Sequence, residues 1–237
     1  MAIYPSRDSI SLRKAGFDEG DISLIFVKIL TELEHLHSQG IIHNDLKMGN
    51  ILLTPRDAEF KRFDTQLIDW NLATFYYSGY ESSKKKGTIC YHSPEGLFKT
   101  SHITPAADIW TLAVVMYSAV AQQKPFAFSC NKSPLKAIAS LVGGKKVVEL
   151  YKKYKFVVPD LHPLIQEMEQ KPEDYPPLDL YSYKVKAEPN HVTEEFISVL
   201  VRMLEVDPEL RPTAPELLQM PYFARQTRLP KVGVMKE

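Results

Sequence analysis

A helical segment that is apolar almost all round most constrains how this chain can fold. Thr104-Pro105 marks its start, because threonine suits the position before a helix and proline is tolerated at the first helical position. Its apolar side chains include Trp110, Leu112, Val115, Met116 and Ala119. The longest apolar run, 109–121, is shorter than the ~20 residues that span a bilayer. The segment is therefore expected to be the central, buried helix of a globular domain.

Other helices are expected on both sides of this segment. Residues 18–39 carry apolar side chains three and four positions apart, which predicts one amphipathic helix that ends at Gly40. Further helices are predicted over 131–142, 193–204 and 213–219, and short strands at 41–42, 51–53 and 66–68. The pattern is typical of a mainly α (α+β) fold.

Two stretches lack a clear period. Residues 71–87 are polar and basic and are interpreted as a long surface loop. Residues 145–190 are rich in proline and tyrosine and are interpreted as an irregular insertion with one short helix near 164–168. The last residues, 226–237, are expected to be a frayed tail behind a domain that covers 1–225.

Composition excludes some classes of function. The 237 residues are 44% hydrophobic and 24% charged, as in an ordinary soluble globular protein. Lys plus Arg number 29, and so do Asp plus Glu, so no charge excess points to nucleic acid or to a membrane as a partner. No signal segment opens the chain, and Cys90 and Cys130 form no spacing motif, so a cytoplasmic or nuclear protein is expected.

Candidate chemistry is concentrated in residues 43–50, His-Asn-Asp-Leu-Lys-Met-Gly-Asn, and in a later Asp-Trp-Asn that begins at Asp69. Phosphoryl transfer needs a base at the accepting hydroxyl, positive charge on the moving group, and oxygen ligands for Mg²⁺. Asp45 can accept the hydroxyl proton, and Lys47 can neutralise the γ-phosphate of ATP. Asn50 and Asp69 can supply a neutral and a charged oxygen to Mg²⁺. The sequence thus predicts catalytic roles for Asp45 and Lys47, and Mg·ATP contacts for Lys47, Asn50 and Asp69.

These segments resemble the catalytic loop and the metal-binding triplet of eukaryotic protein kinases. His-x-Asp-Leu-Lys-x-x-Asn matches the first pattern, and Asp-Trp-Asn stands in place of Asp-Phe-Gly. Ser93-Pro94-Glu95 resembles the end of an activation segment, which would then cover 69–95. Asp108 resembles the aspartate that holds the catalytic loop, and Arg211 the arginine that pairs with Glu95. The resemblance implies structural roles for His43, Trp70, Glu95, Asp108 and Arg211.

A narrower resemblance is to the catalytic subunit of casein kinase 2. That group also has Asp-Trp. The segment 141–154 is similar to its insertion, and the segment 220–223 to the exit of its final helix. The resemblance implies a serine/threonine kinase with acidic protein substrates. The candidates for substrate contact are Lys84, Lys85, Lys86, Thr88 and His92. A solvated loop is an equally open interpretation of the three lysines.

Three residues depart from the family pattern. Asn71 replaces the glycine of the triplet, and asparagine is expected to tolerate the positive φ there. Asn44 replaces an arginine that gathers charge from a phosphorylated activation segment, so activity is not expected to depend on such a phosphate. Ile89 replaces an arginine of the casein kinase 2 group, which subtracts from a basic substrate pocket.

The resemblance covers only a C-terminal lobe. No Gly-x-Gly-x-x-Gly loop and no Val-Ala-x-Lys strand occurs, residues 1–8 resemble a hinge, and the N-terminal β lobe is expected to be missing. Apolar surface around Trp70 is then expected to need that lobe or a partner as cover.

Two functions stay open. One is ATP- and Mg²⁺-dependent phosphoryl transfer to protein hydroxyls, and the other is a catalytically inactive binding module or scaffold. A small-molecule phosphotransferase is disfavoured by the activation-type segment that ends at Ser93-Pro94-Glu95.

Overall fold

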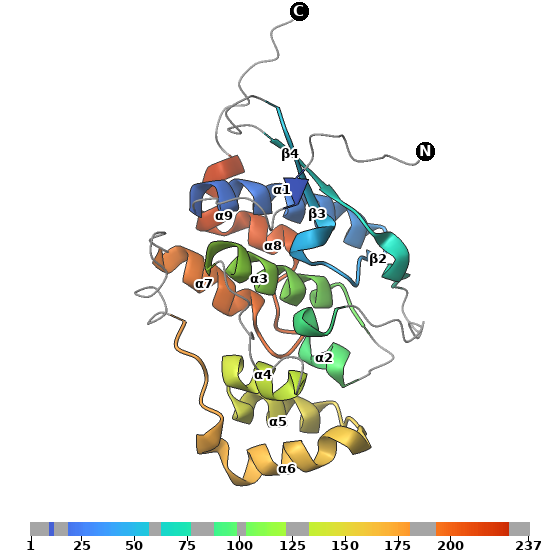
Figure 1. Cartoon of the computed structure of the whole chain (residues 1–237), viewed down its shortest axis with the longest axis vertical. Coiled ribbons are helices and arrows are strands. Elements are labelled where there is room, and N and C mark those ends of the chain that lie inside the picture. The colour runs from blue at the N-terminus through green and yellow to red at the C-terminus, as the bar shows by residue number, and fades with distance from the viewer. Residues whose placement is uncertain are drawn as a thin grey trace, which may run out of the picture.

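The computed structural model of the chain describes residues 10–11, 19–56, 63–76, 88–98, 103–121, 133–180 and 193–227. Its helices are α1 (Glu19–Ser38), α2 (Pro94–Leu97), α3 (Ala106–Ala121), α4 (Pro134–Val142), α5 (Gly144–Lys153), α6 (His162–Gln170), α7 (Glu194–Met203), α8 (Ala214–Gln219) and α9 (Pro221–Thr227). Its strands are β1 (Ile10–Ser11), β2 (Ile41–Ile42), β3 (Ile51–Pro55), β4 (Phe63–Leu67) and β5 (Thr74–Phe75). The predicted mainly helical α+β architecture is therefore present in the described residues (Figure 1).

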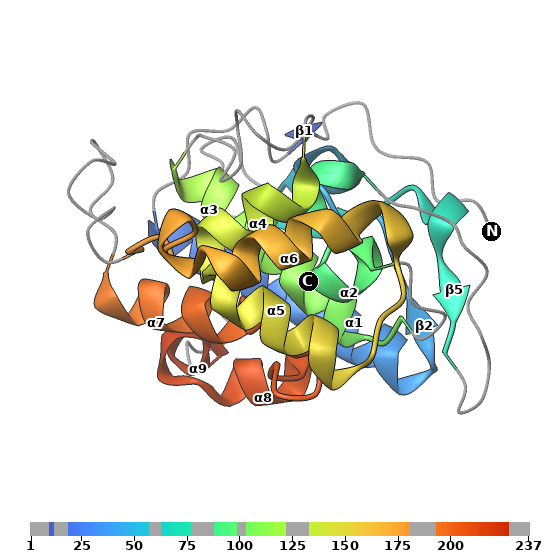
Figure 2. The same cartoon turned by 90° about the horizontal axis from the view of Figure 1, so that it is seen from below.

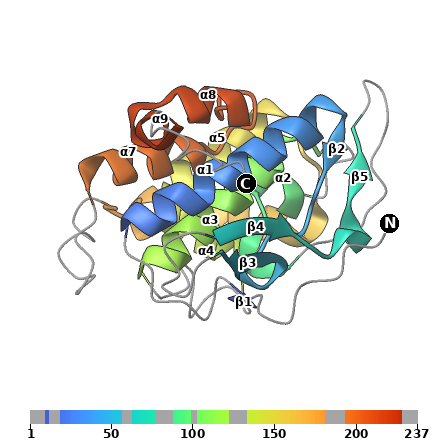
Figure 3. The same cartoon turned by 90° about the horizontal axis from the view of Figure 1, so that it is seen from above.

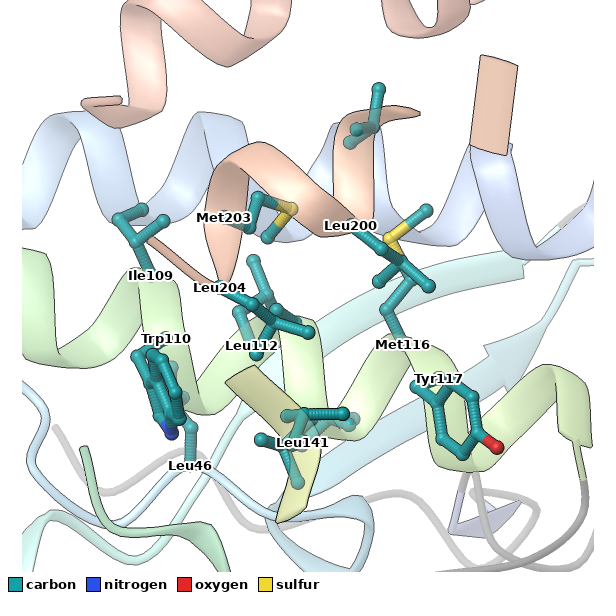
Figure 4. Packing of buried hydrophobic residues seen from close by; sticks show 14 of the residues in the cluster. Leu46, Ile109, Trp110, Leu112, Met116, Tyr117, Leu141, Leu200, Met203 and Leu204 are labelled. Carbon is teal, nitrogen blue, oxygen red and sulfur yellow. The ribbon is translucent and has the colours of Figure 1, made fainter. Parts of the chain in front are cut away.

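Helix α3 lies in the middle of the fold, as its apolar sequence predicts (Figure 1). Leu112 and Met116 are completely buried, and side chains of α7 and α4 surround them from different sides (Figure 4). The helix begins at Ala106, one residue after the predicted start, because Thr104 and Pro105 only supply carbonyls to its first turn. One helix thus carries the centre of the hydrophobic core.

Helix α1 ends where the sequence predicts, and its end sets the position of the next strand. Gly40 has a φ of +70°, and an added Cβ there would lie 2.9 Å from the Tyr76 carbonyl oxygen. Only glycine fits both conditions without strain. The Gly40 carbonyl accepts a 2.6 Å hydrogen bond from the Tyr76 N–H, next to the antiparallel pair β2–β5.

Strand β5 corrects the interpretation of 71–87 as one loop. Its two residues pair with β2 in the register Ile42↔Thr74 and Ile41↔Phe75. Two-residue strands carry no alternating pattern that could be recognised in a sequence. The rest of that stretch, 77–87, lies outside the described residues.

A second sheet has the strand order β1-β3-β4 with antiparallel neighbours. The register pairs Ile51 with Leu67, and the Ile68 N–H donates to the Asn50 carbonyl at 3.0 Å. The ends of β3 and β4 therefore bring residue 50 next to the chain that leads into Asp69. These local strands join the two polar segments of the sequence.

Residues 145–190 are not irregular where the structure describes them. They contain most of α5 and all of α6, which lie together below α4 at one end of the molecule (Figures 1 and 2). Gly143, with a φ of +94°, ends α4 and is also the cap of α5. Gly144 is in close contact with Tyr175, because an added Cβ would lie 2.7 Å from the Tyr175 Cβ. The two glycines mark a turn between helices, and residues 181–190 lie outside the described part.

Helices α7 and α8 confirm the predictions at 193–204 and 213–219. The Thr193 hydroxyl accepts from the Phe196 N–H, and Thr213 forms a capping box with Glu216. Helices α8 and α9 pack along α1 (Figure 3). Since α9 continues to Thr227, the expected tail over 226–237 overlaps helix at its start, and 228–237 lies outside the description.

Among the described residues, strands occur only in these two small sheets. The expected hinge, residues 1–8, lies outside them, as does Asp18 before α1. No described helix is long and apolar enough to cross a membrane.

Candidate active site

A buried carboxylate of α3 holds the start of the 43–50 loop. Asp108 accepts the His43 N–H at 2.8 Å on Oδ2 and the Asn44 N–H at 2.9 Å on Oδ1. His37, in the last turn of α1, places Nε2 3.0 Å from the same Oδ2. Because Asp108 is buried in the central helix, the loop is tied to the hydrophobic core.

His43 connects this loop to the Asp-Trp-Asn triplet. Its Nε2 lies 3.2 Å from the Ile68 carbonyl oxygen, and its Nδ1 accepts the Asp45 N–H at 3.3 Å. The tautomer with the proton on Nε2 satisfies both contacts. The Trp70 ring lies 4.6 Å from the imidazole, between ring centroids, and its indole N–H donates to the Leu67 carbonyl. His43 and Trp70 therefore pack the two polar segments together.

Asp45 lies at the centre of the candidate site, buried, with both carboxylate oxygens engaged. Oδ1 accepts the Thr88 N–H at 3.0 Å and the Thr88 hydroxyl at 2.8 Å. Oδ2 accepts from Lys47 Nζ at 2.6 Å and from Asn50 Nδ2 at 3.2 Å. The structure thus brings together Asp45, Lys47, Asn50 and Thr88.

These contacts decide the charge state of Asp45. Burial raises the pKa of its carboxyl group, but the hydrogen bonds from Lys47 and Thr88 outweigh burial and leave the pKa below its ordinary value. Asp45 is therefore an anion at neutral pH and can accept a proton.

Asp69 adopts a left-handed backbone conformation, with a φ of +64°. The expected positive φ at Asn71 is wrong, because residues 70–72 form a 3₁₀ turn (η3). The positive φ occurs instead at Asp69, the residue before that turn. Asp and Asn are the non-glycine residues that tolerate this region best. The Asn71 side chain instead donates from Nδ2 to Asp69 Oδ1 at 3.0 Å and orients that carboxylate.

The donor set fits a magnesium ion that also binds phosphate. Asp69 is 38% exposed in its side chain and lies 3.9 Å from Lys47 Nζ. Asn50 gives its Nδ2 to Asp45, which turns the amide oxygen away from that carboxylate. Two carboxylates and one lysine leave a net charge of −2 + 1 = −1, which favours a cation. The described residues contain no group of three or more His, Cys, Asp or Glu that could hold a metal ion. A magnesium ion at Asn50 and Asp69 would therefore take its other oxygen ligands from phosphate and water.

Asn44 makes local contacts where the family pattern has an arginine. Its φ is +67°, and its Nδ2 donates to the Thr74 hydroxyl at 3.3 Å. The residue therefore helps to connect the loop to β5.

Arg211 and Glu95 form a second contact of the segment that contains Thr88, near the end of that segment. The Ser93 hydroxyl accepts the Gly96 N–H and caps α2, which carries Glu95. Arg211 donates to both oxygens of Glu95. This pair fixes the end of the 88–95 segment to the core.

The other predicted substrate contacts are only partly described. Lys84, Lys85 and Lys86 lie outside the described residues, so their relation to Asp45 is untested. His92 is half-buried and follows a 3₁₀ turn (η4, Ile89–Tyr91) that begins directly after Thr88.

Glu32 is a contact of the site region that sequence reasoning missed. Its carboxylate accepts the Thr65 hydroxyl at 2.8 Å and the Leu67 N–H at 3.3 Å, just before Asp69. Burial raises the pKa of Glu32 above its ordinary value. The sequence does contain a sign of this contact, since Glu32 lies three residues after Ile29 and therefore next to the apolar stripe of α1. An acid at such a position is expected to have buried partners.

The chain is similar in sequence and in fold to known protein kinases. The sequence profile of the protein kinase domain matches residues 6–223. Casein kinase II subunit alpha' of Saccharomyces cerevisiae is 26% identical over 204 residues, which are 86% of this chain and 57% of that protein. A chain in the crystal structure of the yeast RNA Pol II CTD kinase CTDK-1 complex has a TM-score of 0.72 and 20% identity. That likeness, which shows the fold alone, covers 90% of this chain and 65% of the other. This chain thus spans less than two thirds of the length of casein kinase II subunit alpha' and of the solved chain.

Proposed function

Because this chain belongs to the protein kinase family, we propose that it transfers the γ-phosphoryl group of ATP to a serine or threonine hydroxyl of a protein. The arrangement of Asp45 is the observation that carries this proposal. It is an anion that receives donors from Lys47, Asn50 and Thr88, and the same Lys47 reaches toward Asp69. A base, a cation and two oxygen ligands thereby lie in one small region.

We assign a role to each of these residues. Asp45 accepts the proton of the substrate hydroxyl as that oxygen attacks phosphorus. Lys47, placed between two carboxylates, offers its ammonium group to the phosphate oxygens. Asn50 and Asp69 hold Mg²⁺. Mg·ATP, when bound, supplies the transferable phosphoryl group and the metal charge that offsets its oxygens.

The proposed substrates are proteins, and acidic ones in particular. This finer point rests on the resemblance to the casein kinase 2 group, with Lys84 to Lys86 as the basic residues and Thr88 and His92 as nearer contacts. The resemblance to the casein kinase 2 group favours the cytoplasm or the nucleus as the location, but the cysteines do not support it, because Cys90 is disulfide-bonded.

A further segment or a partner is proposed to cover the nucleotide side of the site. Trp70, Phe75 and Tyr76 are 41%, 56% and 41% exposed, although all three are large apolar or aromatic side chains. All three lie within residues 70–76, directly after Asp69, and Phe75 belongs to β5. Large exposed apolar side chains so close together in sequence favour a surface that contacts another segment or chain.

Phosphate transfer from ATP to a mixture of proteins, with Mg²⁺ present, tests the proposal. We expect Asp45→Asn to lower the rate by ~10²–10⁴-fold, which is the usual contribution of a general base. Asp69→Asn and removal of Mg²⁺ are expected to weaken nucleotide binding as well.

Asp64→Asn is the matched control, because it changes an exposed aspartate of β4 that pairs with Arg56. It is expected to leave the rate unchanged. Full activity in Asp45→Asn would remove the assigned base. Failure of the unaltered chain to transfer phosphate, together with tight capture of a protein partner, would favour the inactive binding module.

A further inference from the structure

The chain enters Asp69 through two residues, Leu67 and Ile68, whose backbone N–H and C=O groups all have hydrogen-bond partners. Three of these partners belong to the candidate site, namely the Trp70 indole N–H, the His43 ring and the Asn50 carbonyl. The fourth comes from outside it, since the Leu67 N–H donates to Glu32 Oε2 at 3.3 Å. Of the four partners, Glu32 is the one that lies on α1.

The Leu67 N–H points away from the sheet to which β4 belongs. The strand order β1-β3-β4 places β4 at an edge of this sheet in the described residues. The Ile68 N–H bonds to the Asn50 carbonyl, which is the pattern beside a non-hydrogen-bonded antiparallel pair, here Ile51↔Leu67. In such a pair the Leu67 N–H is directed away from β3. Glu32 thus supplies an acceptor where a further strand would have supplied one.

A second contact orients the Glu32 carboxylate. Its Oε1 accepts the Thr65 hydroxyl at 2.8 Å, so each carboxylate oxygen has a partner on β4. Helix α1 reaches β4, which lies against it, once more through Lys28, which donates to the Phe63 carbonyl (Figure 3). Glu32 and Lys28 therefore contact opposite ends of the same strand, and Glu32 contacts the end next to Asp69.

Stability does not explain a carboxylate at this place. Burial is the largest influence on Glu32 and raises the pKa of its carboxyl group above the ordinary value, although Thr65, Leu67 and Lys28 act in the opposite direction. The folded protein thus holds this proton more tightly than the unfolded chain does, so the ionised form costs stability at neutral pH. An apolar side chain would avoid that cost but would offer no acceptor to the Leu67 N–H.

We propose that Glu32 is a positioning residue of the candidate site, which fixes the backbone before Asp69 and thereby sets the Asp69 carboxylate for Mg²⁺. This inference rests on the proposed function and adds a residue of α1 to the same site. The Asp69 side chain is 38% exposed, so the backbone that carries it decides where its carboxylate lies. Contacts behind a metal ligand typically change metal affinity or activity by ~10–100-fold.

The effect of Mg²⁺ on nucleotide binding tests the inference without turnover. The affinity of the full chain for a non-hydrolysable ATP analogue is measured by isothermal titration calorimetry with and without Mg²⁺. Glu32→Met removes both acceptor oxygens and keeps a side chain of similar length. It is expected to reduce the gain in affinity due to Mg²⁺ by about tenfold, and to change the affinity without Mg²⁺ by less than about twofold.

Two control variants show whether the acceptor and its place are the cause. Glu32→Gln keeps an oxygen for the Leu67 N–H and an amide N–H for the Thr65 hydroxyl, so it should keep most of the Mg²⁺ effect. Lys28→Met also removes a contact between α1 and β4, but at the end far from Asp69, and it should leave the Mg²⁺ effect as it was.

Two further measurements make the test independent of the folding of Glu32→Met. Thr65→Val leaves Glu32 in place and removes the hydroxyl that orients its carboxylate, so part of the Mg²⁺ effect should be lost. Hydrogen exchange of the Leu67 amide should become faster in Glu32→Met and in Thr65→Val, and stay slow in Glu32→Gln.

The outcomes separate the inference from the proposed function. An unchanged Mg²⁺ effect in Glu32→Met and Thr65→Val, or a loss in Glu32→Gln or Lys28→Met as large as in Glu32→Met, overturns the inference. Phosphate transfer by the unaltered chain would still support the kinase assignment in that case. The expected pattern of binding without transfer by any of the chains supports the positioning role and contradicts the proposed catalysis. Absence of any Mg²⁺ effect in the unaltered chain overturns both.

Discussion

Arg211 donates to both carboxylate oxygens of Glu95, at 2.9 Å from Nη1 and 3.2 Å from Nη2, and neither side chain reaches solvent to any extent. The remaining guanidinium N–H groups go to the carbonyls of Glu205, Ala106 and Val206. All five N–H groups of the guanidinium are thus satisfied. Such a pair tolerates no loss of either partner, because the other would stay charged and buried.

Glu95→Gln should therefore destabilise the protein by ~3–5 kcal/mol, since it leaves the Arg211 charge buried without a counter-charge. Chemical denaturation measures the free energy of unfolding. Glu195→Gln is the control, because Glu195 pairs with Arg225 on the surface, where such pairs contribute only ~0–1 kcal/mol. Equal losses in the two variants would contradict the distinction between the buried and the exposed pair.

Asp108→Asn should loosen the 43–50 loop. An amide offers one acceptor oxygen where the carboxylate offered two, so a buried N–H of His43 or Asn44 loses its partner at ~1–3 kcal/mol. Small displacements of reacting groups can lower rates by ~10²-fold, so kcat is expected to fall more than KM changes.

Steady-state kinetics and denaturation together check this prediction. His37→Ala removes a contact of Asp108 but keeps both backbone hydrogen bonds, and it should have the smaller effect on kcat. A larger effect from His37→Ala would show that the backbone contacts are not what positions the loop.

Lys155→Gly should stabilise the protein, although it removes a side chain. Lys155 has a φ of +51° just after α5, where the Phe156 N–H bonds back to the Tyr151 carbonyl. Glycine adopts this conformation without the steric penalty of a Cβ, worth about 1 kcal/mol. Thermal denaturation should show a rise of about 2–4 °C for a chain of this size.

Lys155→Ala is the comparison for that change, because it shortens the side chain and keeps the Cβ. It should give none of the increase. Equal shifts for alanine and glycine would mean that the lysine side chain, not the backbone, is responsible.

Tyr154 should make stability depend on alkaline pH. Burial, and then the hydrogen bond from its hydroxyl to Asp207, raise the pKa of Tyr154 from 10.0 to about 12. The folded pKa is above the unfolded one, so the stabilisation is complete below pH 10.0 and is lost as the pH rises to about 12.

Unfolding free energies of the unaltered chain and of Tyr154→Phe, measured across that pH range, test the sign. The difference between them should shrink as the pH rises. A constant difference would mean that Tyr154 does not ionise differently in the folded and unfolded states.

The sequence predicts two kinds of feature correctly: long helices with regularly spaced apolar residues, and side chains that are close together in one short loop. Helices α1 and α3 follow from apolar spacing over several turns. The grouping of Asp45, Lys47 and Asn50 follows from their closeness along one loop.

The parts that were missed depend on contacts distant in sequence. Helix α5 buries only Val147, Val148 and Leu150 among its nonglycine residues, and its lysines hide that short stripe. The left-handed turn falls on Asp69 because the path of the chain out of β4 determines where it reverses. Glu32 has its role only because β4 lies against α1.

All the hydrogen-bond positions of the Asp45 carboxylate are already occupied by donors of the chain itself. A carboxylate offers about four lone-pair positions, and Thr88 supplies two donors while Lys47 and Asn50 supply one each. An incoming hydroxyl must therefore displace a donor already in place. Of these donors, Lys47 has a long flexible side chain that is 29% exposed. A nucleotide phosphate would attract its ammonium group away from Asp45. In the proposed transfer, binding of the acceptor hydroxyl would therefore depend on prior binding of the nucleotide, and without nucleotide the Asp45 carboxylate would stay occupied by its own donors.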